Sequence, residues 1–166
     1  MGEMLEYSEK LPHDIGLLLI NKKLTLALAE SCSGGLVSHR ITQVPGSSNY
    51  FLGGVVAYSN DMKMRLLGVH ESTLDQYGAV SKQTAIEMAQ GIKKISDASI
   101  CCAITGIAGP GGGSIEKPLG LVYIAVTSYK QEECKQFQFL GSREEIKIKT
   151  SNEALKMILY SIEHYG

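Results

Sequence analysis

The chain has 166 residues, of which 44% are hydrophobic and 20% charged; this predicts one globular domain with its own core and excludes a low-complexity chain. The 16 basic and 17 acidic residues give a net charge of −1 and form no block of one sign, so no nucleic acid partner is expected. No apolar run reaches the roughly 18 residues that a membrane span requires, so no membrane partner is expected either.

Helical and extended patterns alternate along the chain. The first residues, MGEMLEYSEK, are acidic and polar rather than a secretory signal, so we expect the protein in the cytoplasm. Apolar residues at helical spacing predict a helix over 4–21, in which Pro12 either makes a kink or starts a second helix. LTLALAE at 24–30 is typical of a strand, SGGLVSHRIT at 33–42 predicts a short helix, and VPGSSN at 44–49 predicts a loop.

The middle of the chain repeats this alternation. FLGGVVAYS at 51–59 predicts a second strand, and NDMKMRLLG predicts a helix that Gly68 ends. A further helical turn, with Ser72 as its cap, is expected to end at Gly78. SKQTAIEMAQGIKKIS is the clearest amphipathic helix, and Ser81 is its expected N-cap.

The C-terminal third predicts the rest of a sheet. Three strands and a final helix are expected, at 98–106, 119–128, 133–141 and from 142 onward. The first two are apolar throughout, and the third alternates like a half-exposed edge strand. Residues 1–166 are therefore predicted to form a single α/β domain, most simply a three-layer α/β/α sandwich around a mixed β-sheet.

The cysteines and histidines give no sign of a metal or disulfide. No pair of cysteines makes a CxxC motif, and no histidine has metal-ligand spacing to another ligand. The residues concerned are Cys32, Cys101, Cys102, Cys134, His13, His39, His70 and His164. Reduced thiols and no metal site are expected.

Ligands of such folds bind beyond the carboxyl ends of strands, and the first stretch of this kind is ESCSGG. Ser31 is placed like the nucleophile of a strand-turn-helix elbow, and Gly34 and Gly35 would let a substrate approach the backbone N–H groups that begin the helix. Alternatively, Ser31 or Ser33 only caps that helix. Cys32 is the stronger intrinsic nucleophile but has no histidine partner in view.

The second stretch is YSNDMK, at the end of the next strand. If Ser59 or Asn60 caps the helix, Lys63 lies in its first turn, where the positive end of the dipole favours the neutral amine. A neutral lysine is a suitable base for a serine nucleophile, and Tyr58 would relay the proton or hold the amine. The alternative is a solvated surface lysine beside a partly buried tyrosine.

The third stretch is the glycine-rich segment TGIAGPGGGSIEKPLG at 105–120. Backbone N–H groups of such a loop can cradle a phosphate, although no Walker motif and no G-x-G-x-x-G is present. Pro110 and Pro118 favour a shaped loop over a flexible connection, which is the alternative interpretation.

Four segments in this order resemble the CinA C-terminal domain family: AESCSGG, PGSSNYFLGGVVAYSNDMK, GAVS and TGIAGPGGGSIEKPLGLVYIAV. The resemblance spans roughly residues 5–160. It implies the same α/β/α fold and, as in the family's stand-alone nicotinamide-nucleotide amidohydrolases (PncC, NMN deamidases), hydrolysis of the carboxamide of nicotinamide mononucleotide in pyridine nucleotide salvage. It further implies no metal or cofactor, and a homo-oligomer such as a dimer. The pyrophosphatase activity of the N-terminal domain of two-domain relatives is not expected.

The resemblance also assigns roles. It makes Ser31 the nucleophile and Lys63 the base, assisted by Tyr58. The substrate-binding residues that it implies are Ser33, Gly34, Gly35, Asn60, Thr105, Gly106, Gly109 and Arg143. Among them, Arg143 is expected to bind the phosphate. The chain departs from the family in having Ser33 where threonine is usual and Lys147 where a second arginine is usual. Lysine keeps the positive charge at position 147 but cannot bind a phosphate through two parallel N–H groups as arginine does.

Two other functions remain open from the sequence. The first is a non-catalytic nucleotide-binding module on the same fold, associated with competence or DNA damage responses. The intact set of Ser31, Tyr58 and Lys63 argues against it, because a binding module has no need of these residues. An amidase for another small amide is the second, since nothing in the residues identifies the pyridine ring.

Overall fold

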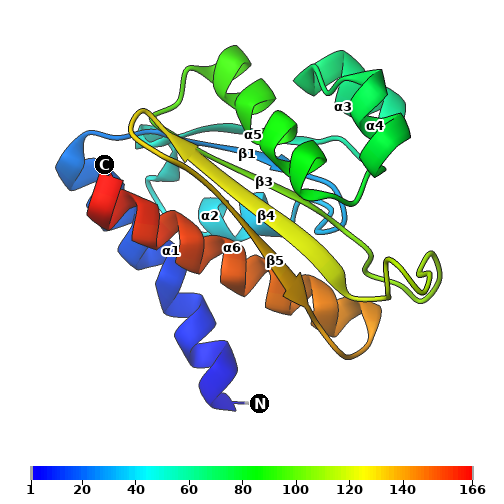
Figure 1. Ribbon diagram of the computed structural model, residues 1–166. Coiled ribbons are helices and arrows are strands. Elements are labelled where there is room, and N and C mark those ends of the chain that lie inside the picture. Colours follow the sequence, from blue (N-terminus) through cyan, green and yellow to red (C-terminus); the bar gives the residue numbers. More distant parts are fainter. Residues whose placement is uncertain (1, 166) are drawn as a thin grey trace.

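The computed structural model describes residues 2–165, and the side chains of residues 10–164. Its centre is a five-stranded sheet in the order β2-β1-β3-β4-β5 (Figure 1). The strands are β1 (Leu26–Glu30), β2 (Phe51–Val56), β3 (Ile100–Gly106), β4 (Leu121–Ser128) and β5 (Glu132–Gln138). β1 pairs in parallel with β2 and β3, whereas β4 pairs antiparallel with both β3 and β5. The predicted mixed sheet is therefore confirmed.

Helices cover both faces of this sheet. One face carries α1 (Gly2–Lys22), α2 (Leu36–Thr42) and α6 (Arg143–Tyr165). The other carries α3 (Asn60–Leu67), α4 (Glu71–Tyr77) and α5 (Lys82–Ser96), and a 3-10 turn, η1 (Ser47–Asn49), precedes β2. Figure 1 shows α5, α3 and α4 above the strands and α1 and α6 below them. The three-layer α/β/α arrangement is as expected.

The two faces of the sheet differ in side-chain size. Large aliphatic side chains pack toward α1 and α6: Leu26, Leu28, Ile100, Ile104, Val122 and Ile124. The face toward α5 is lined by small ones: Ala27, Ala29, Ala103 and Ala125. Because alanine occupies little space, α5 packs close to the sheet, and α3 packs close to α5. A Cβ atom at Gly91 of α5 would lie 1.9 Å from the carbonyl oxygen of Leu67, the last residue of α3.

Two of the predicted helix starts are wrong. The helix expected at 33–42 begins only at Leu36, because Gly34 and Gly35 have φ angles of 64° and 92°, which an α-helix does not accommodate. Ser72 does not cap α4, whose N-cap residue is His70.

Two other helix expectations have clear outcomes. Ser81 caps α5 as predicted, since its side chain accepts a hydrogen bond from Thr84 N. The helix with Pro12 is one continuous element, α1, so the proline does not start a second helix.

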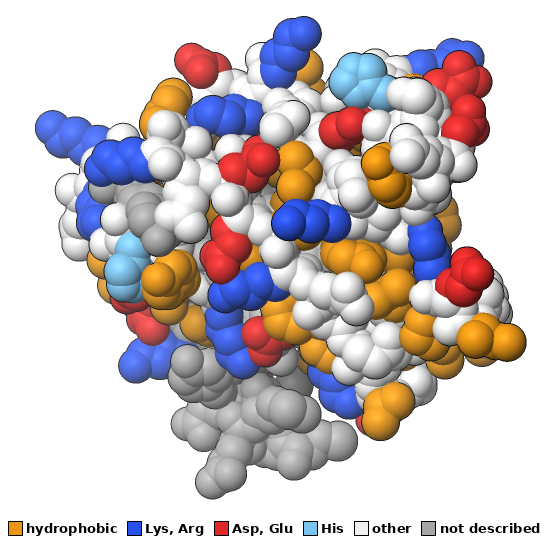
Figure 2. All heavy atoms as spheres, viewed as in Figure 1, with side chains coloured by type: hydrophobic (Ala, Val, Ile, Leu, Met, Phe, Trp, Pro, Cys, Tyr) orange, Lys and Arg blue, Asp and Glu red, His pale blue; other side chains and the backbone are white. Residues whose placement is uncertain are grey.

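The surface carries both signs of charge. Figure 2 shows basic and acidic side chains interspersed over the visible face, with hydrophobic side chains between them. Strongly exposed apolar residues include Ile115 in the glycine-rich loop and Leu140 before α6. Within the described residues, no helix combines the length and the apolar character needed to cross a membrane.

Candidate active site

The carboxyl ends of the three parallel strands lie at one edge of the sheet, and the expected site residues follow them. Ser31 follows β1, Tyr58 follows β2, and Thr105 lies at the end of β3. α6 begins at the same edge with Arg143. Together these segments enclose a pocket of about 170 Å³, lined by Ser31, Cys32, Tyr58, Lys63, Ala79, Val80, Thr105, Gly106, Ala108 and Arg143.

Ser31 and Lys63 meet inside this pocket. The Nζ atom of Lys63 lies 3.0 Å from Ser31 Oγ, and it also donates to the backbone oxygens of Ala57 at 3.0 Å and Tyr58 at 3.1 Å. Both side chains are buried, with 7% of Ser31 and 2% of Lys63 exposed. The interpretation of Lys63 as a solvated surface residue is therefore wrong.

The local fold explains how a lysine comes to lie there. Ser59, as one of the two predicted caps, starts α3 by accepting a hydrogen bond from Met62 N at 3.1 Å. Lys63 is the fourth residue of this helix, on the side that faces the sheet. Its amine thus reaches back to the strand end from which the helix departs.

Burial makes the charged form of Lys63 less favourable than it is for a lysine in water. Burial lowers the pKa of Lys63 below its ordinary value of 10.5, because the charged amine loses its hydration. A neutral amine has two N–H donors and one lone pair. In the charged form, Lys63 Nζ donates to Ser31 Oγ and to the two carbonyls. In the neutral form, the carbonyls of Ala57 and Tyr58 take the two donors, and the lone pair faces the hydroxyl of Ser31. The geometry therefore suits proton transfer from Ser31 to Lys63.

Cys32, the neighbouring candidate nucleophile, is unsuited to that role. Burial raises the pKa of its thiol to about 12, with the negative charge of Glu30 contributing in the same direction. The thiolate is the reactive form of cysteine, so the thiol of Cys32 is unreactive at neutral pH.

The turn that carries Ser31 is closed by hydrogen bonds within the protein. The N–H of Gly34 donates to Ser31 O at 3.0 Å, and Gly35 is the N-cap residue of α2 without a side-chain cap of its own. Neither Ser31 nor Ser33 caps α2, so that alternative is wrong. The hydroxyl of Ser33 is fully buried and has no hydrogen-bond partner among the described residues.

Sequence reasoning missed Glu30, which takes the role of the cap. Its carboxylate accepts hydrogen bonds from the N–H groups of Gly35, Val37 and Ser38 and from the Ser38 hydroxyl, at 2.7–3.2 Å. The N–H of Gly35, expected to face a substrate, is thus already paired. The signal that was overlooked is an acidic residue at the end of an apolar strand, just before a helix.

Tyr58 and Arg143 contact each other at the mouth of the pocket. Arg143 Nη2 donates to the Tyr58 hydroxyl at 2.8 Å, and Arg143 Nη1 donates to the carbonyl of Gly109. Tyr58 is 58% exposed, so the alternative interpretation of a partly buried strand residue is wrong. It holds the amine of Lys63 through its backbone carbonyl, not through its ring.

Thr105 and Gly106 form the floor of the pocket. The Thr105 hydroxyl donates to Ala79 O at 2.6 Å and so ties β3 to the segment before α5. A Cβ atom at Gly106 would lie 2.7 Å from Val122 Cγ2 and 3.0 Å from Cys32 Sγ. Glycine is required at this position because the three segments approach so closely.

The glycine-rich loop after β3 is held by its own hydrogen bonds. Ser114 N donates to Lys117 O at 2.8 Å, and Lys117 Nζ donates to the carbonyl of Tyr77 at the end of α4. Gly109 has a φ angle of 85°, in the region that favours glycine. These contacts give the loop a defined path, as the prediction of a shaped loop requires.

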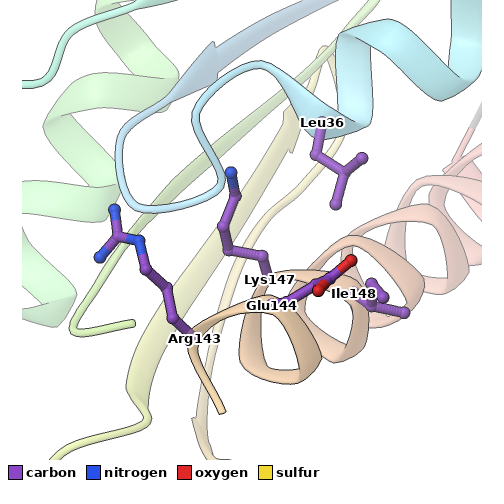
Figure 3. Close-up of a pocket in the computed structure, with 5 residues that line it drawn as sticks. All are labelled: Leu36, Arg143, Glu144, Lys147 and Ile148. Carbon is purple, nitrogen blue, oxygen red and sulfur yellow. The ribbon is translucent and has the colours of Figure 1, made fainter. Parts of the chain in front are cut away.

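A second hollow of about 480 Å³ adjoins the pocket, and Arg143 lines both. Figure 3 shows Arg143 and Lys147 extending from α6 toward the turn that follows β1. A Cβ atom at Gly34 would lie 3.3 Å from Lys147 Nζ. Within the described chain, neither cation is paired with a carboxylate. The carboxylate of Glu144 lines the same hollow, so its two cations outnumber its acids by one. This net positive charge suits an anionic group.

Not every expected residue reaches the pocket. Five of the expected substrate-binding residues line neither hollow: Ser33, Gly34, Gly35, Asn60 and Gly109. Asn60 is exposed at the start of α3. Over the part of the chain that the structure describes, no group of His, Cys, Asp and Glu side chains is arranged to hold a metal ion.

Comparison with known proteins places these features in context. The profile of the CinA C-terminal domain matches residues 8–162. A CinA-like protein of Endomicrobium trichonymphae is 50% identical over 143 residues, which is 86% of this chain and 33% of that protein. The chain spans about a third of the length of the curated relatives that it matches.

Solved structures agree with the fold. The competence/damage inducible protein CihA from Agrobacterium tumefaciens superposes with a TM-score of 0.92 at 40% identity, covering 95% of this chain and 96% of that one. The competence damage-inducible protein A (ComA) from Klebsiella pneumoniae gives a TM-score of 0.92 at 31% identity, covering 96% and 99%.

Proposed function

The chain belongs to the CinA C-terminal domain family, and from this membership and the geometry of its pocket we propose that it is a nicotinamide-nucleotide amidohydrolase. The proposed reaction converts nicotinamide mononucleotide and water to nicotinate mononucleotide and ammonia, as a step of pyridine nucleotide salvage. Competence or damage induction appears only in the names of relatives and describes no chemistry.

One observation carries the proposal: the 3.0 Å contact between Ser31 Oγ and a buried lysine amine whose other donors are occupied. A serine hydroxyl attacks an amide only when a base takes its proton. In the proposed first step, the Lys63 lone pair accepts the proton of Ser31 as its oxygen bonds to the carboxamide carbon. The carbonyl oxygen becomes an oxyanion.

The turn after β1 provides donors for that oxyanion. The N–H groups of Gly34 and Gly35 are paired inside the protein. The remaining candidates are the N–H groups of Cys32 and Ser33, which in this structure lie within hydrogen-bond reach of the Cys32 thiol. In the proposal these two N–H groups bind the oxyanion. Lys63 then returns its proton to the leaving nitrogen, so that ammonia departs and a Ser31 ester remains. Water, deprotonated by Lys63, attacks the ester; as the bond to Ser31 breaks, Lys63 returns the proton to the serine oxygen, and the nicotinate product leaves.

The two hollows match the two ends of the proposed substrate. The smaller one, which contains Ser31 and Lys63, accepts the carboxamide end. The adjoining one, with Arg143 and Lys147, accepts the phosphate. A guanidinium presents parallel donors that fit phosphate oxygens, whereas Lys147 contributes a point charge. Arg143 lies between the two hollows and so contributes to both.

Ammonia release by the purified protein, with EDTA present, tests the proposal. The substrates are nicotinamide mononucleotide, nicotinamide riboside, nicotinamide and glutamine at equal concentrations. We expect the mononucleotide to be hydrolysed fastest, because it alone combines the pyridine carboxamide with a phosphate. Faster hydrolysis of glutamine would make the protein an amidase for another amide. Binding of the mononucleotide in calorimetry without any ammonia release would make it a nucleotide-binding module.

A further inference from the structure

Glu30 is a fully buried carboxylate whose hydrogen bonds all come from the segment after Ser31. Its Oε2 atom accepts from Gly35 N at 3.0 Å and Val37 N at 3.2 Å. Its Oε1 atom accepts from Ser38 N at 2.8 Å and Ser38 Oγ at 2.7 Å. A buried carboxylate without an ion-pair partner is costly unless such donors surround it.

These bonds fix both ends of the short turn that presents Ser31. Glu30 is the last residue of β1, and its own carbonyl accepts from Ala57 N at 2.9 Å. Its carboxylate holds the first turn of α2, which has no cap of its own. The residues between, 31–34, are therefore clamped between a strand and a helix.

Packing around the carboxylate leaves it little freedom. A Cβ atom at Gly54 of β2 would lie 2.4 Å from Ser38 Oγ, so the missing side chain of glycine is what admits the Ser38 hydroxyl to this place. Ser38 in turn donates two of the four hydrogen bonds to Glu30.

We propose that Glu30 is the positioning residue of the nucleophile: its carboxylate holds the turn 31–34 so that Ser31 Oγ stays within reach of Lys63 Nζ. The inference rests on the proposed function for the identity of the nucleophile. It adds a residue that touches no substrate and acts through Ser31. Its loss should lower the reactivity of Ser31 with little effect on substrate binding.

The test uses a fluorophosphonate probe as well as the substrate. Ser31 oxygen bonds to phosphorus, fluoride leaves, and Lys63 takes the hydroxyl proton; intact-protein mass follows the adduct, and Ser31→Ala is the blank. Glu30→Gln keeps the side-chain size but turns one acceptor oxygen into an NH₂ donor, which faces other donors. We expect the labelling rate and kcat to fall about 10- to 100-fold, as a small misplacement of a reacting atom does, with KM changed less than about threefold.

Glu87→Gln is the matched control. Glu87 also holds the start of a helix, since it accepts from His70 N at 2.9 Å and Thr73 Oγ1 at 2.6 Å in front of α4, but it lines neither hollow. Its variant should lose thermal stability and keep the wild-type labelling rate. Ser38→Ala removes only the 2.7 Å hydroxyl bond, so it should fold and give a smaller fall than Glu30→Gln.

The outcomes separate this inference from the proposed function. If the wild type is labelled at Ser31 but releases no ammonia, the proposed substrate is wrong. The role of Glu30 is then decided by the labelling rates of the variants alone. Unlabelled wild-type protein would overturn both. Wild-type labelling rates in both Glu30→Gln and Ser38→Ala, or an equal loss in Glu87→Gln, would overturn the positioning role alone. If Glu30→Gln does not fold, Ser38→Ala decides: a reduced labelling rate supports the role, and an unchanged rate overturns it.

Discussion

The amine of Lys63 lies 3.0 Å from the hydroxyl of Ser31, although 32 positions separate the two residues in the chain. When the amine is neutral, the backbone carbonyls of Ala57 and Tyr58 accept its two N–H groups. The serine is thus the group that faces its lone pair. This relationship has consequences for pH dependence, for the neighbouring tyrosine and for substrate choice.

The rate should depend on pH through Lys63. Only the neutral amine accepts the proton of Ser31, and burial lowers the pKa of Lys63 below 10.5. We therefore expect kcat to rise with pH and reach a plateau before the ordinary pKa of lysine, in a profile from about pH 5 to about pH 10. Lys63→Arg, which stays charged throughout, should be inactive at every pH. A wild-type rate that falls as the pH rises over this range would contradict the assignment.

Tyr58→Phe should distinguish two roles for the tyrosine. The variant keeps the backbone carbonyl that holds Lys63 and loses the hydroxyl that binds Arg143. We expect kcat to fall less than about tenfold and KM to rise, because Arg143 loses one of its anchors. Loss of a proton relay would instead lower kcat by about 10²- to 10⁴-fold. Steady-state kinetics with the mononucleotide separates the two.

Arg143→Ala should discriminate between phosphorylated and unphosphorylated substrates. Loss of a hydrogen bond to a charged group costs about 1.5–3 kcal/mol, so kcat/KM for the mononucleotide should fall about 10- to 100-fold. The value for nicotinamide riboside, which lacks the phosphate, should change much less. Lys147→Arg, which adds a guanidinium fork in the same hollow, should lower KM for the mononucleotide. Equal losses for both substrates in Arg143→Ala would place the phosphate elsewhere.

Gly91→Ala should destabilise the protein. Alanine has a better helix propensity than glycine, by about 1 kcal/mol, so propensity alone predicts a gain. The added Cβ would lie 1.9 Å from Leu67 O, and the resulting strain should lower the free energy of unfolding by about 1–3 kcal/mol. Gly111→Ala is the control, since its Cβ would meet nothing within 4 Å. Chemical denaturation measures both, and a stabilised Gly91→Ala variant would refute the close packing of α3 on α5.

The sequence predicted the elements and the strand ends where the site lies. Strong apolar patterns located β1, β3 and β4, and the capping serine before α3 placed Lys63 near its N-terminus. Each of Ser31, Tyr58 and Thr105 was predicted at the end of a strand, where ligands of such folds bind. The combination of Ser31, Tyr58 and Lys63 into one site came from the family resemblance.

The local details depended on tertiary contacts that no pattern reveals. The predicted start of α2 was wrong because Gly34 and Gly35 have positive φ angles. The first turn of the helix is capped by the carboxylate of Glu30 and not by a serine. Lys63 is buried on α3, which also packs against α5 at Gly91, and no local pattern in the sequence indicated either contact. Arg143 was expected to bind phosphate, but its contact with Tyr58 spans 85 positions and had no sequence signal.

Ammonia release from nicotinamide mononucleotide by the wild type, Ser31→Ala and Lys63→Ala, side by side with EDTA, tests the central claim most directly. The wild type should release ammonia, and both variants should lose essentially all activity while keeping the fold, as circular dichroism would verify. Full activity in folded Ser31→Ala would contradict the serine nucleophile, and full activity in folded Lys63→Ala would contradict the lysine base.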